Sequence, residues 1–217
     1  MKTIVVTGFS GNLGHSVAAK FLEEGYTVCG ADKVKTDQPG IDTSMVDLVD
    51  EKAAEAWIKS VINNYHVIGV AVLTAGGFAM ADIAGTSASA IAEQYKLNFE
   101  TAYNVARPVF VQMMKQGSGR IFLIGSRAGL HTGNSKGMIA YGLSKSLLFR
   151  LAELMNAEAA GTDVKIVVVV PSTIDTPQNR TAIPDADFSK WQTPDSIAAT
   201  IFANIKRNAE TGMIIEL

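Results

Sequence analysis

The sequence predicts one α/β domain: a doubly wound, mainly parallel sheet of seven strands with helices on both faces. Short β-branched segments alternate with longer segments of helical periodicity, the order of elements that builds a parallel sheet. The segment 165–170 (KIVVVV) is almost entirely apolar, as expected of a central strand covered on both faces. A chain of 217 residues has room for one such core, so residues 1–217 are interpreted as a single domain.

The β-branched segments place the expected strands, and the apolar periodicity places the expected helices. Strands are predicted at residues 4–7, 27–31, 44–46, 67–74, 120–124, 164–170 and 213–216. Helices are predicted at residues 12–24, 50–63, 87–116, 138–160 and 194–208. Gly25 is expected to end the first helix. Pro108 has no backbone N–H to donate, so we expect it to bend or break the third helix near Arg107.

Composition and charge argue against several classes of protein. The 19 Lys and Arg against 21 Asp and Glu give a net charge of −2, which lacks the basic footprint of a protein that binds nucleic acid or an anionic membrane. No apolar segment has the length of roughly 18 residues that a membrane span needs. Cys29 has no internal disulfide partner, and the three histidines lack metal-ligand spacing, so no metal is expected. The expected location is the cytoplasm.

A glycine-rich turn, residues 7–14 (TGFSGNLG), follows the first expected strand and opens the first expected helix. In Rossmann-type folds such a turn holds the pyrophosphate of a dinucleotide against the helix N-terminus. Gly8 would permit the turn, Gly11 would let the backbone approach the phosphates, and Gly14 would allow the helix to pack closely on the strand. The alternative is an ordinary turn between a strand and a helix. The candidate cofactor-binding residues here are Gly8, Ser10, Gly11, Asn12, Leu13 and Gly14.

Asp32 ends the second expected strand 18 residues after the last glycine of this turn, close to the spacing of about 20 residues at which a carboxylate binds the adenosine ribose of NAD. A carboxylate here would repel the 2′-phosphate of NADP, so NAD(H) is favoured over NADP(H). Lys33 and Lys35 could neutralise that repulsion and keep NADP(H) open. Asp47 and Leu48 follow the third expected strand, where the carboxylate could meet the adenine amino group. Turn or helix-capping roles are the alternatives for both aspartates.

Three residues with catalytic chemistry follow in the second half of the chain. Ser126 stands just beyond a strand, and Tyr141 and Lys145 are four residues apart and therefore share one face of a helix. Combined with the glycine-rich turn, this order resembles the short-chain dehydrogenase/reductase family over essentially the whole chain. The resemblance implies hydride transfer between a nicotinamide cofactor and a small-molecule substrate, and a homodimer or homotetramer. Taken singly, the three could be a turn serine, a half-buried aromatic and a solvated lysine.

The resemblance implies a role for each side chain. Tyr141 would be the general acid/base, Lys145 would hold the nicotinamide ribose and lower the pKa of Tyr141, and Ser126 would hydrogen-bond the substrate oxygen. An unperturbed phenol has a pKa of about 10, so a positive charge nearby is needed for proton transfer at neutral pH. Asn98 matches the family position that binds a water in a proton relay toward the lysine. Its alternative is a structural asparagine that interrupts a helix.

Two further segments resemble parts of the family that contact the cofactor. Residues 73–77 (LTAGG) resemble the segment after the fourth strand, with Thr74 in place of an asparagine whose side chain stabilises the sheet. Residues 171–176 (PSTIDT) resemble a Pro-Gly-x-Val-x-Thr turn, with Ser172 for glycine. By this resemblance Ile174 and Thr176 would meet the nicotinamide carboxamide. The segments add the candidates Ala75, Gly76, Gly77, Pro171, Ile174 and Thr176.

Segments 75–78, 137–145, 174–180 and 183–191 are similar to quinonoid dihydropteridine reductases, with two departures. Those enzymes lack the serine that stands here as Ser126, and they carry tryptophan where this chain has Phe78. An imine-like pterin needs hydride and a proton but no serine aimed at a carbonyl oxygen, so Ser126 favours carbonyl–alcohol chemistry. Dihydropteridine reduction and non-catalytic dinucleotide sensing are the alternatives. Residues 176–192 are expected to form a substrate lid, in which Phe188 and Trp191 either close on the substrate or anchor the packing.

Overall fold

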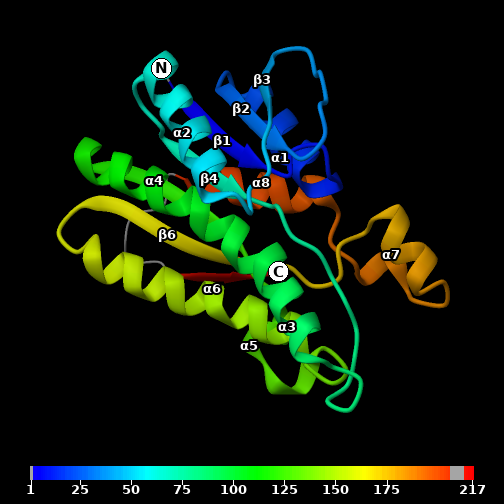
Figure 1. Cartoon of the computed structure of the whole chain (residues 1–217). Helices are drawn as coiled ribbons and strands as arrows, with labels where there is room; N and C mark the ends of the chain where they lie inside the picture. The colour runs from blue at the N-terminus through cyan, green and yellow to red at the C-terminus, as the bar shows by residue number, and fades with distance from the viewer. Residues whose placement is uncertain (1, 206–212) are drawn as a thin grey trace.

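A computed structural model describes residues 2–205 and 213–217, and in these residues seven parallel strands form one sheet (Figure 1). The strand order is β3-β2-β1-β4-β5-β6-β7, which confirms the predicted doubly wound α/β domain. The strands are β1 (Thr3–Thr7), β2 (Thr27–Asp32), β3 (Ile41–Met45), β4 (Val70–Leu73), β5 (Ser118–Ile124), β6 (Asp163–Val170) and β7 (Ile214–Glu216).

Helices cover both faces of the sheet. The main helices are α1 (Asn12–Glu23), α2 (Glu51–Tyr65), α3 (Ala88–Tyr95), α4 (Thr101–Gln116), α5 (Arg127–Leu130), α6 (Ile139–Glu158), α7 (Pro177–Ala182) and α8 (Pro194–Asn204). Successive side chains of a strand point to opposite faces, so each central strand contributes to a core on either side. Ile4 and Val6 of β1 belong to the core beneath α1 and α8, whereas Val5 belongs to the core beneath α2, α4 and α6.

Five of the strand predictions are confirmed to within two residues, and two are wrong at their ends. The third strand is Ile41–Met45 rather than residues 44–46, because it is an edge strand and tolerates polar side chains that hide its apolar pattern. The fourth begins at Val70 rather than at residue 67. The side-chain amide of Gln116 accepts from the N–H of Ile68 at 3.0 Å and donates to its carbonyl oxygen at 2.9 Å, so a side chain replaces the strand ladder here.

The helix predicted at residues 87–116 is interrupted, but not at the proline. Pro108 lies inside α4, which continues without a break to Gln116, so the predicted break near Arg107 is wrong. Val105 and Val109 are fully buried on either side of the proline, and their packing holds the helix in place despite the missing donor. The interruption is a π-helical turn at Lys96–Glu100, between α3 and α4.

The ends of the last helix and of the first differ little from expectation. The first helix ends at Glu23, and Gly25 follows it with φ of 76°, as predicted for a helix terminator. The last ends at Asn204, and the predicted residues 206–208 lie outside the described residues. In the part of the chain that the structure describes, no helix is long and apolar enough to cross a membrane.

The topology brings four loops to one edge of the sheet. The strand order reverses between β1 and β4, which is the switch point at which α/β sheets bind ligands. Because all strands are parallel, the loops after β1, β4, β5 and β6 lie at the same edge. These loops contain or lead into most of the predicted site residues.

Candidate active site

The glycine-rich turn joins β1 to α1 at the switch point. Gly8 adopts a left-handed conformation with φ of 61°, and its N–H donates to the carbonyl oxygen of Ala31 at 2.8 Å. A Cβ atom at Gly14 would overlap the carbonyl oxygen of Gly8, so glycine is required for the helix to start this close to the turn. The helix begins after Gly11 without a side-chain cap, which leaves its first N–H groups available to an anion. These features fit a pyrophosphate-binding turn.

The remaining candidates of the turn differ in exposure. Leu13 is buried in the core beneath α1, so it supports the turn rather than facing a ligand. Ser10 and Asn12 are exposed. The Nδ2 atom of Asn12 donates to Oε1 of Gln178 in α7 at 3.0 Å, which links the turn to the predicted lid.

Asp32 ends β2 beside the turn. One carboxylate oxygen accepts from both the hydroxyl and the N–H of Ser10, and the other accepts from the N–H of Lys33 at 2.7 Å. Asp32 is therefore held against the turn, which fits a ribose-binding role. Asp47 instead accepts from the N–H of Val49 at 3.1 Å and is exposed, as an ordinary turn residue would be. Leu48 is buried, so its side chain belongs to the core.

The segment after β4 brings bare backbone into the site. The hydroxyl of Thr74 donates to the carbonyl oxygen of Thr7 at 2.6 Å, so Thr74 ties the end of β4 to β1 as the asparagine of the family would. The N–H of Ala75 donates to the hydroxyl of Thr7 at 3.2 Å and adds a second link. A Cβ atom at Gly76 would lie 2.6 Å from Oδ1 of Asn98 and 3.4 Å from Nζ of Lys145. Glycine therefore leaves space where these two polar groups converge, as a cofactor cradle requires.

The end of β5 and the first turns of α6 bring Ser126, Tyr141 and Lys145 together. Ser126 lies two residues after the end of β5 and caps α5, its hydroxyl accepting a backbone N–H at 3.2 Å. Tyr141 and Lys145 share one face of α6, with Nζ of the lysine 5.9 Å from the centre of the tyrosine ring. The same Nζ atom donates to the carbonyl oxygen of Ile124, the last residue of β5, at 2.9 Å.

Burial controls the charge of both side chains on α6. It raises the pKa of Tyr141, and a hydrogen bond with Ser126 opposes that rise. It lowers the pKa of Lys145 to about 8. This differs from the expectation that Lys145 lowers the pKa of Tyr141. Desolvation dominates in the structure, and the opposing contact comes from the serine.

Asn98 is buried in the π-helical turn and hydrogen-bonded on both sides of its amide. Its Oδ1 atom accepts from the N–H of Gly77 at 3.0 Å, and its Nδ2 atom donates to Gln94 and Ser144. Both partners of Nδ2 are buried, and neither was predicted from the sequence. Gln94 lies one turn before Asn98 on the same helical path, a spacing that could have indicated it.

The segment after β6 leads into α7, which projects from the edge of the sheet (Figure 1). Pro171 is buried, Ile174 is partly buried against the core, and Thr176 caps α7 by accepting from the N–H of Asn179 at 3.2 Å. The rings of Phe188 and Trp191 pack 4.8 Å apart. The two rings therefore contact each other within the expected lid.

Two further features were not identified from the sequence. The ring of Phe78 meets that of Tyr141 edge to face at 4.9 Å, placing an apolar wall at the acid/base candidate.

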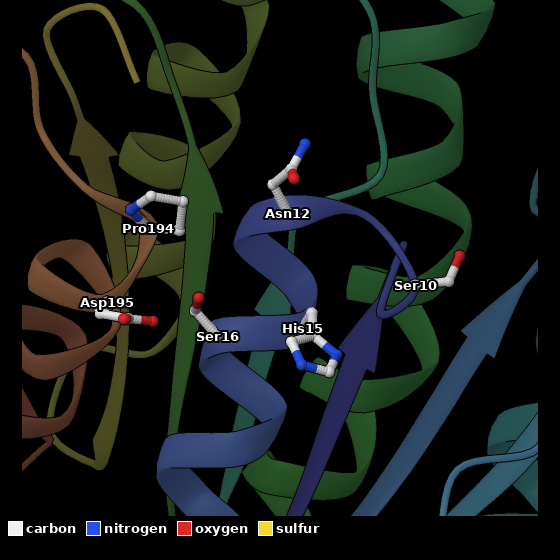
Figure 2. A pocket seen from close by; sticks show the side chains of 6 residues that line it. All are labelled: Ser10, Asn12, His15, Ser16, Pro194 and Asp195. Carbon is white, nitrogen blue, oxygen red and sulfur yellow. The ribbon is translucent and has the colours of Figure 1, made fainter. Parts of the chain in front are cut away.

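The second feature is a groove of about 340 Å³ between the starts of α1 and α8, where Ser16 and Asp195 lie across from each other (Figure 2). Its walls are far apart in sequence, so no local pattern indicates it. The groove is lined by Ser10, Asn12, His15, Ser16, Pro194 and Asp195.

A profile of the family described as short chain dehydrogenase matches residues 2–187. The chain belongs to this family. Short-chain dehydrogenases bind a nicotinamide dinucleotide, and membership makes the protein an oxidoreductase that acts on a small molecule. The glycine-rich turn, the cradle at Gly76 and the grouped Ser126, Tyr141 and Lys145 are the features of this chain that fit such a cofactor and its chemistry.

Several short-chain dehydrogenases are similar along most of the chain. The 2,3-dihydro-2,3-dihydroxybenzoate dehydrogenase of Escherichia coli is 30% identical over 181 residues, which cover 83% of this chain and 72% of the relative. The dihydropteridine reductase of Dictyostelium discoideum is 27% identical over 208 residues, covering 93% and 86%. The structure of ElxO with NADP bound superposes with a TM-score of 0.90 at 22% identity, over 99% of this chain and 96% of that one. This last likeness shows the fold alone.

Proposed function

We propose that the protein transfers a hydride between NAD(H) and a small carbonyl or alcohol substrate. The observation that carries the proposal is the grouping of Ser126, Tyr141 and Lys145 at the ligand-binding edge of the sheet, with the partly buried Tyr141 ring between Phe78 and the Nζ atom of Lys145. A serine and a tyrosine at this edge can present two hydroxyl groups to one substrate oxygen.

The proposed chemistry divides between the cofactor and these side chains. When bound, the nicotinamide supplies or accepts the hydride. Ser126 donates a hydrogen bond to the substrate oxygen, and Tyr141 gives its proton to that oxygen in reduction or removes it in oxidation. Lys145, held by the carbonyl oxygen of Ile124, is placed to hold the nicotinamide ribose. Phe78 packs edge to face against the tyrosine ring and gives the site one apolar wall.

Asp32 supports the preference for NAD(H) within this proposal. Its carboxylate is fixed beside the turn by Ser10 and Lys33. A fixed negative charge repels a 2′-phosphate and accepts hydrogen bonds from ribose hydroxyls. ElxO, a protein of the same fold, has a structure with NADP bound, and titration with both cofactors distinguishes the two cases.

Residues 176–192 are proposed as the substrate lid, and a homodimer or homotetramer as the assembly. The hydrogen bond between Asn12 and Gln178 supports the lid, because it connects this segment to the glycine-rich turn.

Apolar side chains exposed on the outer face of α6 support the proposed homodimer or homotetramer. They are Leu143, Leu147 and Leu154.

Dihydropteridine reduction is the second candidate, favoured by the Dictyostelium relative. A cofactor oxidation assay separates the candidates. The protein is mixed with NADH or NADPH and with either a panel of aldehydes and ketones or a quinonoid dihydropterin, and the absorbance of the reduced cofactor is followed. We expect NADH oxidation with a carbonyl compound. Turnover of the pterin alone would support the second candidate, and cofactor binding without any turnover would support a non-catalytic sensor.

A further inference from the structure

Asn98 is the centre of a buried hydrogen-bond network that joins three segments of the site. Its amide holds Gly77 after β4 through Oδ1, and it holds Gln94 of α3 and Ser144 of α6 through Nδ2, at 3.0 and 3.2 Å. Asn98, Ser144 and Gln94 are 1%, 2% and 8% exposed, so water does not compete for these bonds.

The polarity of the neighbours dictates which way the Asn98 amide points. The hydroxyl of Ser144 donates its own hydrogen to the carbonyl oxygen of Tyr141 at 2.8 Å, so its oxygen acts as an acceptor toward Asn98. Oε1 of Gln94 is the second acceptor, whereas the N–H of Gly77 is a donor. A reversed amide would set its NH₂ group against the N–H of Gly77 and its oxygen against two acceptors.

We propose that Gln94 is a positioning residue of the active site. By accepting one hydrogen of the Asn98 amide, it directs Oδ1 toward Gly77, while the other hydrogen engages Ser144 and thereby the backbone of Tyr141. Gln94 thus couples the glycine backbone beside Lys145 to the first turns of α6, although it lies in α3 and none of its hydrogen bonds reaches the reacting groups directly. The effect on turnover rests on the proposed function, but the effect on Gly77 does not.

Three substitutions separate the acceptor from the bulk of the side chain. Gln94→Met keeps the length and removes the acceptor, whereas Gln94→Glu keeps a carbonyl oxygen at the same position. Gln112→Met is the matched control, because Gln112 donates to the carbonyl oxygen of His66 at 3.1 Å and accompanies Gln116 on α4, where it supports no candidate active-site residue.

The test combines amide hydrogen exchange of the cofactor-free protein with steady-state kinetics. In Gln94→Met, exchange of the Gly77 amide should accelerate at least about tenfold, because its acceptor is no longer held. The kcat value should fall by roughly 10- to 100-fold while KM for the substrate changes less, since positioning rather than binding is lost. Gln94→Glu should restore most of both, and Gln112→Met should leave both at the wild-type level.

Two results would overturn the proposal. One is a Gly77 amide in Gln94→Met that exchanges at the wild-type rate. The other is a Gln94→Glu protein as impaired as Gln94→Met, which would mean that the acceptor is not what matters. If Gln94→Met does not fold, Gln94→Leu, which also lacks an acceptor, takes its place in both comparisons. Because exchange is measured without cofactor or substrate, its outcome is independent of whether a carbonyl compound is turned over.

Discussion

Ser10 donates both its hydroxyl and its backbone N–H to the same carboxylate oxygen of Asp32. The other oxygen already accepts from the N–H of Lys33. A carboxylate with three donors is firmly placed, but it has fewer free lone pairs for a ligand. The hydroxyl of Ser10 therefore occupies an acceptor position that a ribose hydroxyl could take.

This arrangement gives a prediction on cofactor choice. Asp32→Ala should weaken NADH binding by about 10- to 100-fold, the effect of losing hydrogen bonds to a charged group, and should narrow the difference between NADH and NADPH. Calorimetric titration of wild type and variant with both cofactors measures the change. A wild-type protein that prefers NADPH would show that Lys33 and Lys35 dominate over Asp32.

Ser126 separates the two enzymatic candidates. Ser126→Ala removes one hydroxyl from the substrate oxygen and also the hydrogen bond that opposes the raised pKa of Tyr141. For a carbonyl substrate, kcat should fall by about 10²-fold, the scale of one lost transition-state donor. Steady-state kinetics with the best carbonyl substrate and with quinonoid dihydropterin test this. Unchanged turnover of the carbonyl compound would exclude the proposed role of the serine.

The lowered pKa of Lys145 should make the stability of the cofactor-free protein depend on pH. Burial lowers its pKa from 10.5 to about 8, so between these values the unfolded chain binds a proton that the folded chain does not. The free energy of unfolding should therefore rise with pH above pH 8, by up to about 3 kcal/mol in total. The matched variant Lys145→Met should lack this rise.

Urea unfolding of both proteins from pH about 7 to about 10 makes the comparison, because the difference between them removes the contribution of the other titrating groups. Parallel pH profiles for wild type and Lys145→Met would show that burial does not lower the pKa of this amine. Lys145→Met should also bind NADH more weakly, which the same samples report by titration.

The parallel sheet and the order of its elements could be predicted because they depend on local patterns. The β-branched run 165–170 and the glycine-rich turn each indicate their structure without knowledge of the rest of the chain. The positions of Ser126, Tyr141 and Lys145 were also accessible, since strand ends and helix faces follow from spacing alone.

Features that depend on contacts between distant segments could not be predicted. The side chain of Gln116 binds the backbone of Ile68 just before β4 begins, and Asn12 contacts Gln178, which is 166 positions away in the sequence. The raised pKa of Tyr141 is of the same kind, because it follows from burial by the assembled fold. The alternation of apolar and polar residues carries no information on such contacts.

The central claim is that Tyr141 transfers the proton, and Tyr141→Phe tests it most directly. The substitution removes one hydroxyl and keeps the ring that packs against Phe78, so the glycine-rich turn and its cofactor affinity should be preserved. Stopped-flow measurement of hydride transfer, with an equilibrium NADH titration on the same protein, should show near wild-type affinity and a rate lower by roughly 10²- to 10⁴-fold. A Tyr141→Phe protein that transfers hydride at the wild-type rate would contradict the account, because the proton would then come from another group.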